Sequence, residues 1–326
     1  MIAAPVHCFD IGGSKIACAR LDERLQPVAP RTVATPVRCR DALVAALAGL
    51  LGPHDGSPLA VAIAGAIDPG TGTVRCANIP CVDGIGLGAW LGARLQRRVH
   101  LLNDADAFAL GCAHEAAGGA DGSGSLDDPD GPAGGGNMAG TVFVAIIGTG
   151  IGGGIVVDGR LLRGARGGPG EWGHAPAVAS RTGTPLPRLP CNCGQTGCVD
   201  TLCGARGLER LHAYLHAETL DSRTIVDAWR RQGARATRTV DVWLDATGGA
   251  LSGAINLLDP HTVVVGGGLA GDADLVAALD RETCARVLPP RPATLLRQVP
   301  ATGGQALVGA ALHAWRNASA DVDRAG

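Results

Sequence analysis

Two hairpins with glycine-rich turns are the feature that most restricts how this chain can fold. An apolar strand is predicted at residues 6–9, and it runs through the turn Gly12-Gly13-Ser14-Lys15 into a second strand at 16–21. A similar unit follows at 141–157, where an apolar strand, a glycine segment and another strand lead to the turn signal Asp158-Gly159. Because the same unit opens both halves, we interpret the chain as a duplicated structure.

Strands and helices alternate in the rest of the chain. The first half has the predicted order strand–strand–strand–helix–strand–helix–strand–helix, in which we assign no bounds to the third strand. Apolar residues at helical spacing indicate the helices, and short apolar runs indicate the strands. Helices are predicted at 40–51, 87–95, 103–116, 224–235, 240–257 and 305–317, and further strands at 59–64, 99–102 and 262–265. This alternation indicates an α/β fold.

A low-complexity segment separates the two halves. Residues 117–140 are mostly Gly, Asp, Ser, Pro and Ala, with almost no apolar side chain to bury. Such a composition is typical of a mobile, partly disordered loop. We therefore predict an N-terminal α/β lobe at 1–116 and a C-terminal α/β lobe, with a zinc loop, at 141–302.

Composition and charge exclude several classes of function. The chain has 326 residues with 28 basic and 30 acidic side chains, so its net charge gives no reason to bind nucleic acid or an anionic membrane. The longest apolar run is broken by five glycines, and the N-terminus has no signal-peptide pattern. The eleven cysteines are scattered apart from three at 191–198, which is typical of reduced thiols. We expect a cytoplasmic protein.

The loop predicted at 148–154 contains Gly148-Thr149-Gly150 and matches the dinucleotide pattern G-x-G-x-x-G. A dinucleotide site needs a helix directly after the glycines, because the pyrophosphate binds at the helix N-terminus. Here residues 155–157 continue as a strand, so we reject that interpretation. A glycine turn in a hairpin can instead hold phosphate through free backbone N–H groups. One such turn is more often structural, but two at equivalent places favour phosphate binding.

The segment Asn103-Asp104-Ala105-Asp106 lies between an apolar strand and a helix. One interpretation is a helix cap, in which Asn or Asp accepts the first free N–H groups of the helix. The other is catalytic, because open α/β sheets bind ligands at the carboxyl ends of their strands. A carboxylate there could accept the proton of an attacking hydroxyl group. The residues alone leave both interpretations open.

A cluster of thiols follows in the second half. Cys191, Cys193 and Cys198 lie on a tight glycine turn, and His174 lies 17 residues before the first of them. Three cysteines and one histidine complete a tetrahedral structural zinc site. The alternative is three incidental cysteines. Because such a site is closed, we expect zinc to hold a loop rather than to activate water.

The two glycine turns resemble the two phosphate motifs of the actin-like, ribonuclease H-like ATPase fold. That resemblance implies two duplicated lobes with a cleft between them that closes on ATP, and a last helix at about 303–317 packed back on the first lobe. It also implies that Asp10 helps to hold Mg²⁺, in part through water, although Asp10 alone is compatible with an ordinary turn residue. The implied contacts with ATP are Asp10, Gly12, Gly13, Ser14, Lys15, Gly148, Thr149, Gly150 and, in an adenosine motif, Gly266, Gly267 and Gly268.

Three further motifs resemble those of the ROK family (repressors, open reading frames, kinases), over nearly the whole chain from Cys8 to Trp315. They are N-D-A at 103–105, E-x-G-H at 171–174 and C-x-C-G-x-x-G-C at 191–198. The resemblance implies that Asp104 is the catalytic base and that His174 both binds zinc and contacts the sugar. The implied sugar contacts are Asn103, Asp104, Glu171, His174, Asp200 and Gly65.

Four positions depart from the usual pattern of the family. Ser14 replaces Thr, Asp106 replaces Asn beside the expected base, and Ala64-Gly65 replaces Pro-Gly. Asp200 replaces Glu. Because Asp is one methylene shorter, the sugar contact implied for Asp200 is expected to be lost or mediated by water.

Within the family, residues 191–207 and 256–260 resemble bacterial members that phosphorylate N-acetylglucosamine. The resemblance therefore implies ATP-dependent phosphorylation of the 6-hydroxyl of N-acetyl-D-glucosamine, with Mg²⁺ and a structural Zn²⁺. A ROK glucokinase, fructokinase or N-acetylmannosamine kinase is the alternative within the class, and a noncatalytic sugar-sensing ROK protein is the alternative outside it. ROK repressors carry an N-terminal helix-turn-helix, for which the first strand at 6–9 leaves no room. We expect a homodimer.

Overall fold

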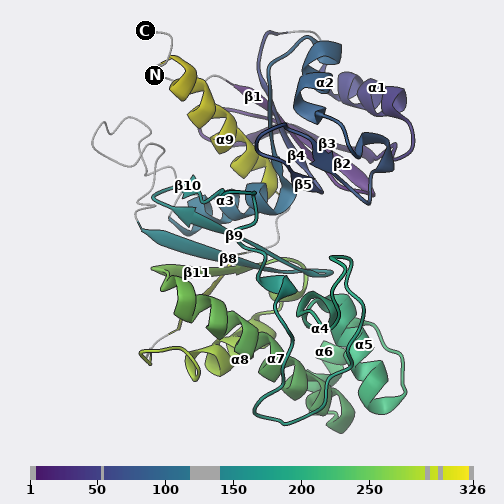
Figure 1. Ribbon diagram of the computed structural model, residues 1–326, viewed down its shortest axis with the longest axis vertical. Coiled ribbons are helices and arrows are strands. Elements are labelled where there is room, and N and C mark those ends of the chain that lie inside the picture. Colours follow the sequence, from purple (N-terminus) through teal and green to yellow (C-terminus); the bar gives the residue numbers. More distant parts are fainter. Residues whose placement is uncertain (1–4, 53–54, 118–139, 291–293, 300–303, 323–326) are drawn as a thin grey trace. The chain divides into compact units, whose positions relative to one another are not determined.

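The structure is a computed structural model that describes residues 5–52, 55–117, 140–290, 294–299 and 304–322 (Figure 1). The loop predicted at 117–140 therefore lies outside the described residues except at its two ends. The chain consists of two compact units. Unit 1 takes the described residues within Met1–Ala139, Asp158–Pro169 and Thr302–Gly326, and unit 2 those within Gly140–Val157 and Gly170–Ala301. No helix in the described ranges is long and apolar enough to cross a membrane.

Unit 1 is built on a five-stranded sheet with the order β3-β2-β1-β4-β7. The first three strands pair antiparallel, whereas β1, β4 and β7 run parallel. Parallel strands end at the same edge of a sheet, and Asp10 and Asn103 both lie at the ends of such strands. The strands are β1 (Val6–Ile11), β2 (Lys15–Leu21), β3 (Pro27–Ala34), β4 (Leu59–Ile63) and β7 (Val99–Asn103).

Helices cover both faces of this sheet (Figure 1). Alternate strand residues such as Phe9, Ile11 and Val61 share one apolar core with α1 and α2. On the opposite face, α9 packs on β1, β4 and β7 and against α3. The helices are α1 (Arg40–Leu51), α2 (Leu87–Leu95), α3 (Asp104–Ala116) and α9 (Gln305–Val322), and the smaller elements are β5 (Ala66–Ile67), β6 (Val74–Arg75), η1 (Pro80–Val82) and β10 (Arg160–Leu161).

Two glycines allow α3 and α9 to touch through their backbones. A Cβ atom on Gly309 would lie 1.8 Å from the Ala107 carbonyl oxygen, and one on Gly111 would lie 2.0 Å from the Gln305 carbonyl oxygen. No side chain fits in either place. Since protein interiors are close-packed, this crossing holds α3 firmly, and α3 begins at Asp104.

Unit 2 repeats the scheme of the first sheet. Its strands have the order β9-β8-β11-β12, in which β8 and β9 form an antiparallel hairpin and β8, β11 and β12 run parallel. This corresponds strand for strand to β2-β1-β4-β7 in unit 1. The strands are β8 (Thr141–Ile147), β9 (Ile151–Val157), β11 (Thr262–Gly266) and β12 (Leu296–Gln298). The duplication predicted from the two hairpins is therefore present in the topology.

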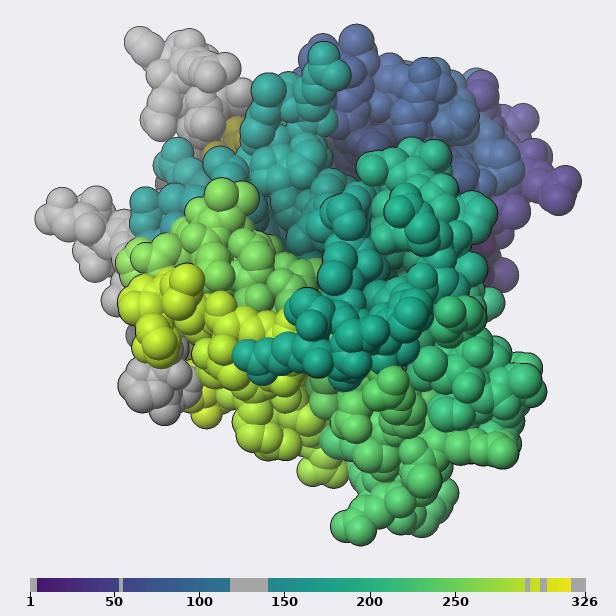
Figure 2. All heavy atoms as spheres, turned by 60° about the horizontal axis from the view of Figure 1, so that its bottom comes forward, coloured from purple at the N-terminus to yellow at the C-terminus, as the bar shows by residue number. Residues whose placement is uncertain are grey.

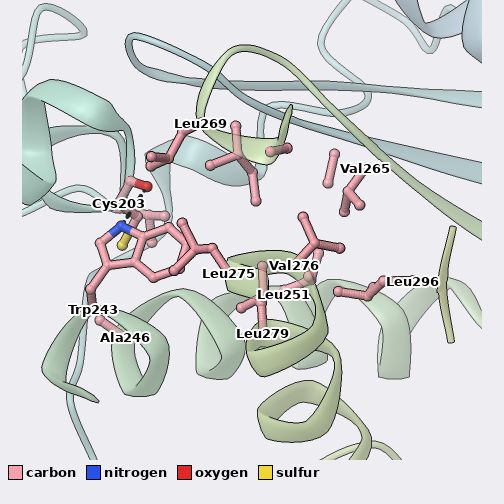
Figure 3. Packing of buried hydrophobic residues seen from close by; sticks show 14 of the residues in the cluster. Cys203, Trp243, Ala246, Leu251, Val265, Leu269, Leu275, Val276, Leu279 and Leu296 are labelled. Atoms are coloured by element: carbon pink, nitrogen blue, oxygen red, sulfur yellow. Dashed lines mark hydrogen bonds between the residues drawn. The ribbon is translucent and has the colours of Figure 1, made fainter. Parts of the chain in front are cut away.

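The core of unit 2 lies between this sheet and its helices (Figure 3). Trp243 of α7 is buried there, and its indole N–H donates to the Cys203 carbonyl oxygen at 2.8 Å. Leu275 and Leu279 of α8 face Val265 of β11 across the same core. The remaining elements are η2 (Trp172–His174), α4 (Asp200–Cys203), α5 (Ala205–His216), α6 (Ser222–Arg230), α7 (Ala234–Leu258), η3 (Leu269–Gly271) and α8 (Ala273–Cys284).

Most predicted elements occur close to their predicted bounds, and α1 and α2 match them residue for residue. Two predictions were wrong in part. The loop predicted at 148–154 ends early, because β9 begins at Ile151 and its glycines pair with β8. The helices predicted at 224–235 and 240–257 are α6 and α7, and the break between them lies at Gln232, which has φ of 59°. The elements β3, α5, α8 and β12 were given no bounds.

Candidate active site

The first glycine turn joins β1 to β2, and three of its carbonyl groups accept hydrogen bonds from the protein. The Gly12 carbonyl accepts from Thr35 Oγ1 at 2.6 Å, and the Ser14 carbonyl accepts from the Thr35 N–H at 3.2 Å. The Lys15 carbonyl accepts from the Gly12 N–H at 3.0 Å. Within the described residues, the N–H groups of Gly13 and Ser14 have no hydrogen-bond partner. Free N–H groups on a turn form a concavity that binds anions.

The second glycine turn joins β8 to β9, and its carbonyl groups also accept hydrogen bonds from the protein, but from different residues. The Ala205 N–H donates to the Gly148 carbonyl at 2.8 Å, and the Arg206 N–H donates to the Thr149 carbonyl at 3.2 Å. The Gly150 carbonyl accepts from the Gly148 N–H at 3.0 Å. All three carbonyls are thus engaged, whereas the N–H groups of Thr149 and Gly150 lack a partner in the part of the chain that is described. The backbone of the turn therefore offers two N–H donors to a ligand.

The glycines after β11 lie against this second turn. Gly267 has φ of +101°, and a Cβ atom there would lie 2.7 Å from the Ile147 carbonyl oxygen and 2.9 Å from the Gly148 nitrogen. Only glycine combines that backbone conformation with so close an approach. The structure therefore brings the predicted adenosine segment, Gly266 to Gly268, next to the predicted phosphate turn.

Asn103 caps α3. The sequence had left open whether Asn103 or Asp104 forms this cap. Its Oδ1 accepts from the N–H groups of Ala105 at 2.8 Å and Asp106 at 3.2 Å. Its Nδ2 donates to the Gly65 carbonyl at 2.8 Å and to Asp104 Oδ1 at 3.1 Å. A Cβ atom on Gly65 would lie 2.5 Å from a backbone oxygen, so glycine is required there. Asp104 is the first residue of the helix and is not its cap.

The Asp104 carboxyl group lies in an unusual electrostatic environment. Burial, together with the nearby charge of Asp10, raises its pKa to about 6. The hydrogen bond from the Ala105 N–H opposes this shift. Burial also raises the pKa of Asp10, against the charge of Lys15. Two interacting carboxyl groups at the ends of parallel strands are typical of a catalytic or metal-binding site. The neighbouring carboxylate that acts on the expected base is thus Asp10.

Four potential metal ligands converge in unit 2. The ligand atoms of His174, Cys191, Cys193 and Cys198 all lie within 4.8 Å of one another. The Cys193 and Cys198 sulfur atoms are 3.7 Å apart, and Cys191 Sγ lies 3.5 Å from His174 Nδ1. Zinc–sulfur bonds of 2.3 Å at tetrahedral angles place two sulfur atoms about 3.8 Å apart. The donor set and its spacing therefore fit zinc.

The thiols of this cluster differ in their ionisation. The Gln195 backbone N–H lowers the pKa of Cys193, whereas burial raises the pKa of Cys198 to about 12. A bound dication favours the thiolate form of both, since a coordinating thiol loses its proton. All eleven cysteines are free in the structure, as expected for reduced thiols.

His174 links this cluster to Glu171. With Nδ1 toward Cys191, its Nε2 lies 3.3 Å from Glu171 Oε2. A proton on Nε2 leaves the Nδ1 lone pair for a metal, which is the usual arrangement of a histidine ligand with a carboxylate partner. The Trp172 indole N–H donates to the Gly152 carbonyl at 2.7 Å and fastens this segment to β9. Glu171 itself is exposed.

A buried aspartate anchors the segment between His174 and the cysteines. Asp245 of α7 accepts from the N–H groups of Arg181 and Thr182 and from Thr182 Oγ1, the last at 2.9 Å. Burial opposes its ionisation, but the Thr182 N–H and Arg286 nevertheless lower its pKa. Arg181 also donates to the Ala285 carbonyl, and in Figure 2 this teal segment lies over the yellow-green end of α8. The segment between His174 and the cysteines is therefore held by contacts with α7 and with the residue that follows α8, in addition to the cluster at its two ends.

Sequence reasoning missed several of these positioning residues. The N–H groups of Ala205 and Arg206 hold the second turn, and the preceding Gly204 would place a Cβ atom 2.6 Å from Gly150 Cα. The glycines around Ala205, directly after the cysteine cluster, were the available signal. Thr35 and Asp245 had no such signal, because ordinary Thr and Asp residues carry no pattern of their own. The sugar contacts that the family resemblance implies stay predictions for all six residues, which are Asn103, Asp104, Glu171, His174, Asp200 and Gly65.

Comparison with known proteins gives relatives over nearly the whole chain. The N-acetyl-D-glucosamine kinase of Pectobacterium atrosepticum is 32% identical over 292 residues, which are 86% of this chain and 89% of that protein. That of Erwinia tasmaniensis is 33% identical over 289 residues, with the same shares of both chains.

Solved structures with the same fold include two enzymes of the same family. The ROK hexokinase from Thermus thermophilus has a TM-score of 0.78 and 28% identity, and the match covers 97% of this chain and 99% of that one. A ROK family glucokinase from Streptomyces griseus, solved with glucose and AMPPNP, has a TM-score of 0.71 and 26% identity over 94% of this chain and 98% of that one.

These matches confirm the predicted duplicated α/β fold of the actin-like, ribonuclease H-like ATPase type. The sequence model of the ROK family matches residues 6–123 and 133–316. This range includes both glycine turns, Asp104 and the cysteine cluster. The chain belongs to the ROK family.

Proposed function

We propose that this protein is a kinase that transfers the γ-phosphoryl group of ATP to the 6-hydroxyl of N-acetyl-D-glucosamine. The relatives named N-acetyl-D-glucosamine kinase support the sugar, because they match over 89% of their length. The glucokinase solved with AMPPNP supports the nucleotide. The identity of the phosphorylated hydroxyl rests on the resemblance to the family.

The observation that carries the proposal is the Asp104 carboxylate. A base that takes a proton from a sugar hydroxyl works best when its pKa lies near the operating pH. Burial and the charge of Asp10 raise the pKa of Asp104 to about 6, which meets that condition. Because Asn103 caps α3, the Asp104 carboxylate is not needed for capping. In our proposal Asp104 accepts the proton of the 6-hydroxyl as that oxygen attacks the γ-phosphorus.

The two glycine turns supply the donors that phosphates need. In our proposal the free N–H groups of Gly13, Ser14, Thr149 and Gly150 contact phosphate oxygens. Asp10 would hold Mg²⁺, in part through water, and this ion supplies charge neutralisation on the transferred group when it is bound. Glycines 266–268 would contact the adenosine, since they lie beside the second turn.

The zinc site is a structural part of the proposal. His174, Cys191, Cys193 and Cys198 would hold the ion, and their geometry fits it without an open position. Their task would be to fix the segment that carries Glu171, so that this carboxylate and the His174 ring face the sugar. Asp245 supports the same segment from α7.

The experiment is a coupled ADP-release assay with N-acetylglucosamine, glucose, fructose and N-acetylmannosamine. We expect the highest kcat/KM for N-acetylglucosamine. A site built to bond the 2-acetamido amide leaves polar groups unpaired with glucose. A preference for glucose or fructose would contradict N-acetylglucosamine as the substrate but not the assignment of the protein as a sugar kinase. No ADP release with any of the four sugars would remove both.

Three further expectations are part of the proposal. We propose functional lobes at 1–116, with the helix at about 303–317, and at 141–302. We also propose a homodimer and a cytoplasmic location. Sedimentation of the purified protein tests the dimer, and fractionation of cells tests the location.

A further inference from the structure

Asp200 contacts the second glycine turn directly. Its Oδ1 accepts a hydrogen bond from the Ile151 N–H at 2.7 Å. A Cβ atom on Gly150 would lie 2.5 Å from the same oxygen, so the carboxylate lies against the turn where only glycine leaves room. Asp200 opens α4, two residues after the last cysteine of the zinc cluster.

The bond from Ile151 to Asp200 is one of three hydrogen bonds by which α4 and α5 hold the turn. The carbonyls of Gly148 and Thr149 are held by the N–H groups of Ala205 and Arg206, which open α5. Asp200 holds the first N–H beyond the turn, so the chain is fastened on both sides of Thr149 and Gly150. Within the described residues, the two backbone N–H groups of the turn that have no partner are those that our proposed function gives to phosphate.

The same bond engages one oxygen of the carboxylate for which the family resemblance implies a sugar contact. A carboxylate oxygen that accepts at 2.7 Å from a backbone N–H is committed to that position. We propose, on the basis of the kinase function above, that Asp200 is a positioning residue for the nucleotide turn at 148–151 and that its replacement weakens nucleotide binding rather than sugar binding.

The side-chain chemistry makes this proposal specific. Asn offers an oxygen at the same place without a charge, so Asp200→Asn keeps the bond to the Ile151 N–H. Ala removes the acceptor and leaves that N–H without its partner. A sugar contact through a carboxylate would instead be weakened by both replacements.

The test is calorimetric titration of the wild type, Asp200→Ala and Asp200→Asn with AMPPNP and Mg²⁺, and separately with N-acetylglucosamine. We expect Asp200→Ala to weaken AMPPNP binding by about tenfold, the scale of one hydrogen bond to a charged group. Sugar affinity is expected to stay within about twofold, and Asp200→Asn is expected to restore AMPPNP binding. Asp241→Ala on the exposed face of α7 is the control for loss of one aspartate.

A second measurement keeps the inference separate from the kinase assignment. Hydrogen exchange of the unliganded protein reports the Ile151 amide itself, and it should be about tenfold faster in Asp200→Ala than in Asp200→Asn. Weakened sugar binding with unchanged AMPPNP binding would overturn the inference and leave the kinase standing. If the wild type binds no AMPPNP, the proposed function fails, and the nucleotide role of Asp200 fails with it.

Discussion

The two glycine turns occupy equivalent places in the two units and are held in different ways. Both follow the first strand of a sheet, and in each turn three carbonyls accept hydrogen bonds while two N–H groups have no partner in the described residues. In unit 1 a single residue, Thr35 after β3, supplies the donors. In unit 2 the donors come from α5, and Asp200 adds a bond to the Ile151 N–H.

This difference connects only the second turn to the cysteine cluster. The segment from Cys198 through Asp200 to Arg206 runs from the zinc ligands to the turn within nine residues. The first turn is held by Thr35, which follows the edge strand β3. Duplication thus preserved the backbone geometry of the turn while the residues that support it diverged. The proposed proton transfer and the proposed Mg²⁺ lie with the first turn, beside Asp10 and Asp104, and the dependence on zinc lies with the second.

The largest effect is expected at Asp104. Asp104→Asn keeps an acceptor for the Ala105 N–H but removes the base, so kcat should fall by roughly 10²–10⁴ with sugar binding retained. Removing a charge from a site that raises its pKa should also stabilise the fold, on the order of 1–3 kcal/mol. Steady-state kinetics and thermal unfolding measure both effects. Asp106→Asn on the same helix turn is the control, and near-normal turnover of Asp104→Asn would return Asp104 to a structural role.

The pH dependence follows from the same group. The proposed base is ionised only above a pH of about 6, so kcat/KM should fall about tenfold per unit below that value. The folded state keeps this proton up to pH of about 6, whereas an unfolded Asp releases it near 3.9. The contribution of Asp104 to the free energy of unfolding therefore decreases as the pH rises between these values. A flat rate profile from pH 5 to 7 would contradict the assignment.

Replacing a zinc ligand should affect one turn and spare the other. Cys193→Ser is expected to lower zinc content well below one per chain and to destabilise the protein, because a structural zinc site contributes directly to folding. Hydrogen exchange should rise at residues 148–151 and stay unchanged at 12–15. Cys39→Ser, outside the cluster, is the control. An equal rise in hydrogen exchange at both turns in Cys193→Ser would contradict the link between the cysteine cluster and the second turn alone.

The smallest effect is expected at Thr35. Thr35→Val removes the hydroxyl that donates to the Gly12 carbonyl but keeps the shape of the side chain. One neutral hydrogen bond contributes about 1 kcal/mol, which predicts a rise in the KM for ATP of roughly threefold to tenfold. The sugar KM and the exchange at 148–151 should not change. Thr32→Val in the preceding strand β3 is the control, and an equal change in both variants would refute the role of Thr35.

Local patterns were enough to predict much of the fold. The helix spacing at 40–51 and 87–95 gave α1 and α2 their observed bounds, and the repeated hairpin gave the duplication. The elements without bounds have weak local signals. β3 is an exposed edge strand with two prolines, and β12 has only three residues, too few to show a period. The break between α6 and α7 depends on the positive φ at Gln232, which glutamine rarely adopts.

The sequence predicted candidate residues for the site, but it did not predict the residues that hold them in place. Cysteine spacing alone predicted the convergence of His174 with the three thiols. The capping role of Asn103, and not Asp104, depends on which side chain the backbone turns toward the helix end. The bond of Asp200 to the Ile151 N–H depends on a contact between segments 49 residues apart. Such contacts leave no period or motif in the sequence.

The most direct measurement is phosphorus and proton NMR of the product formed from ATP and N-acetylglucosamine. The account predicts one new phosphomonoester, coupled to the protons at carbon 6, that forms together with ADP. Asp104→Asn should give none over the same time while it still binds AMPPNP. ADP that appears with inorganic phosphate alone, or a phosphate on another hydroxyl, would contradict the account.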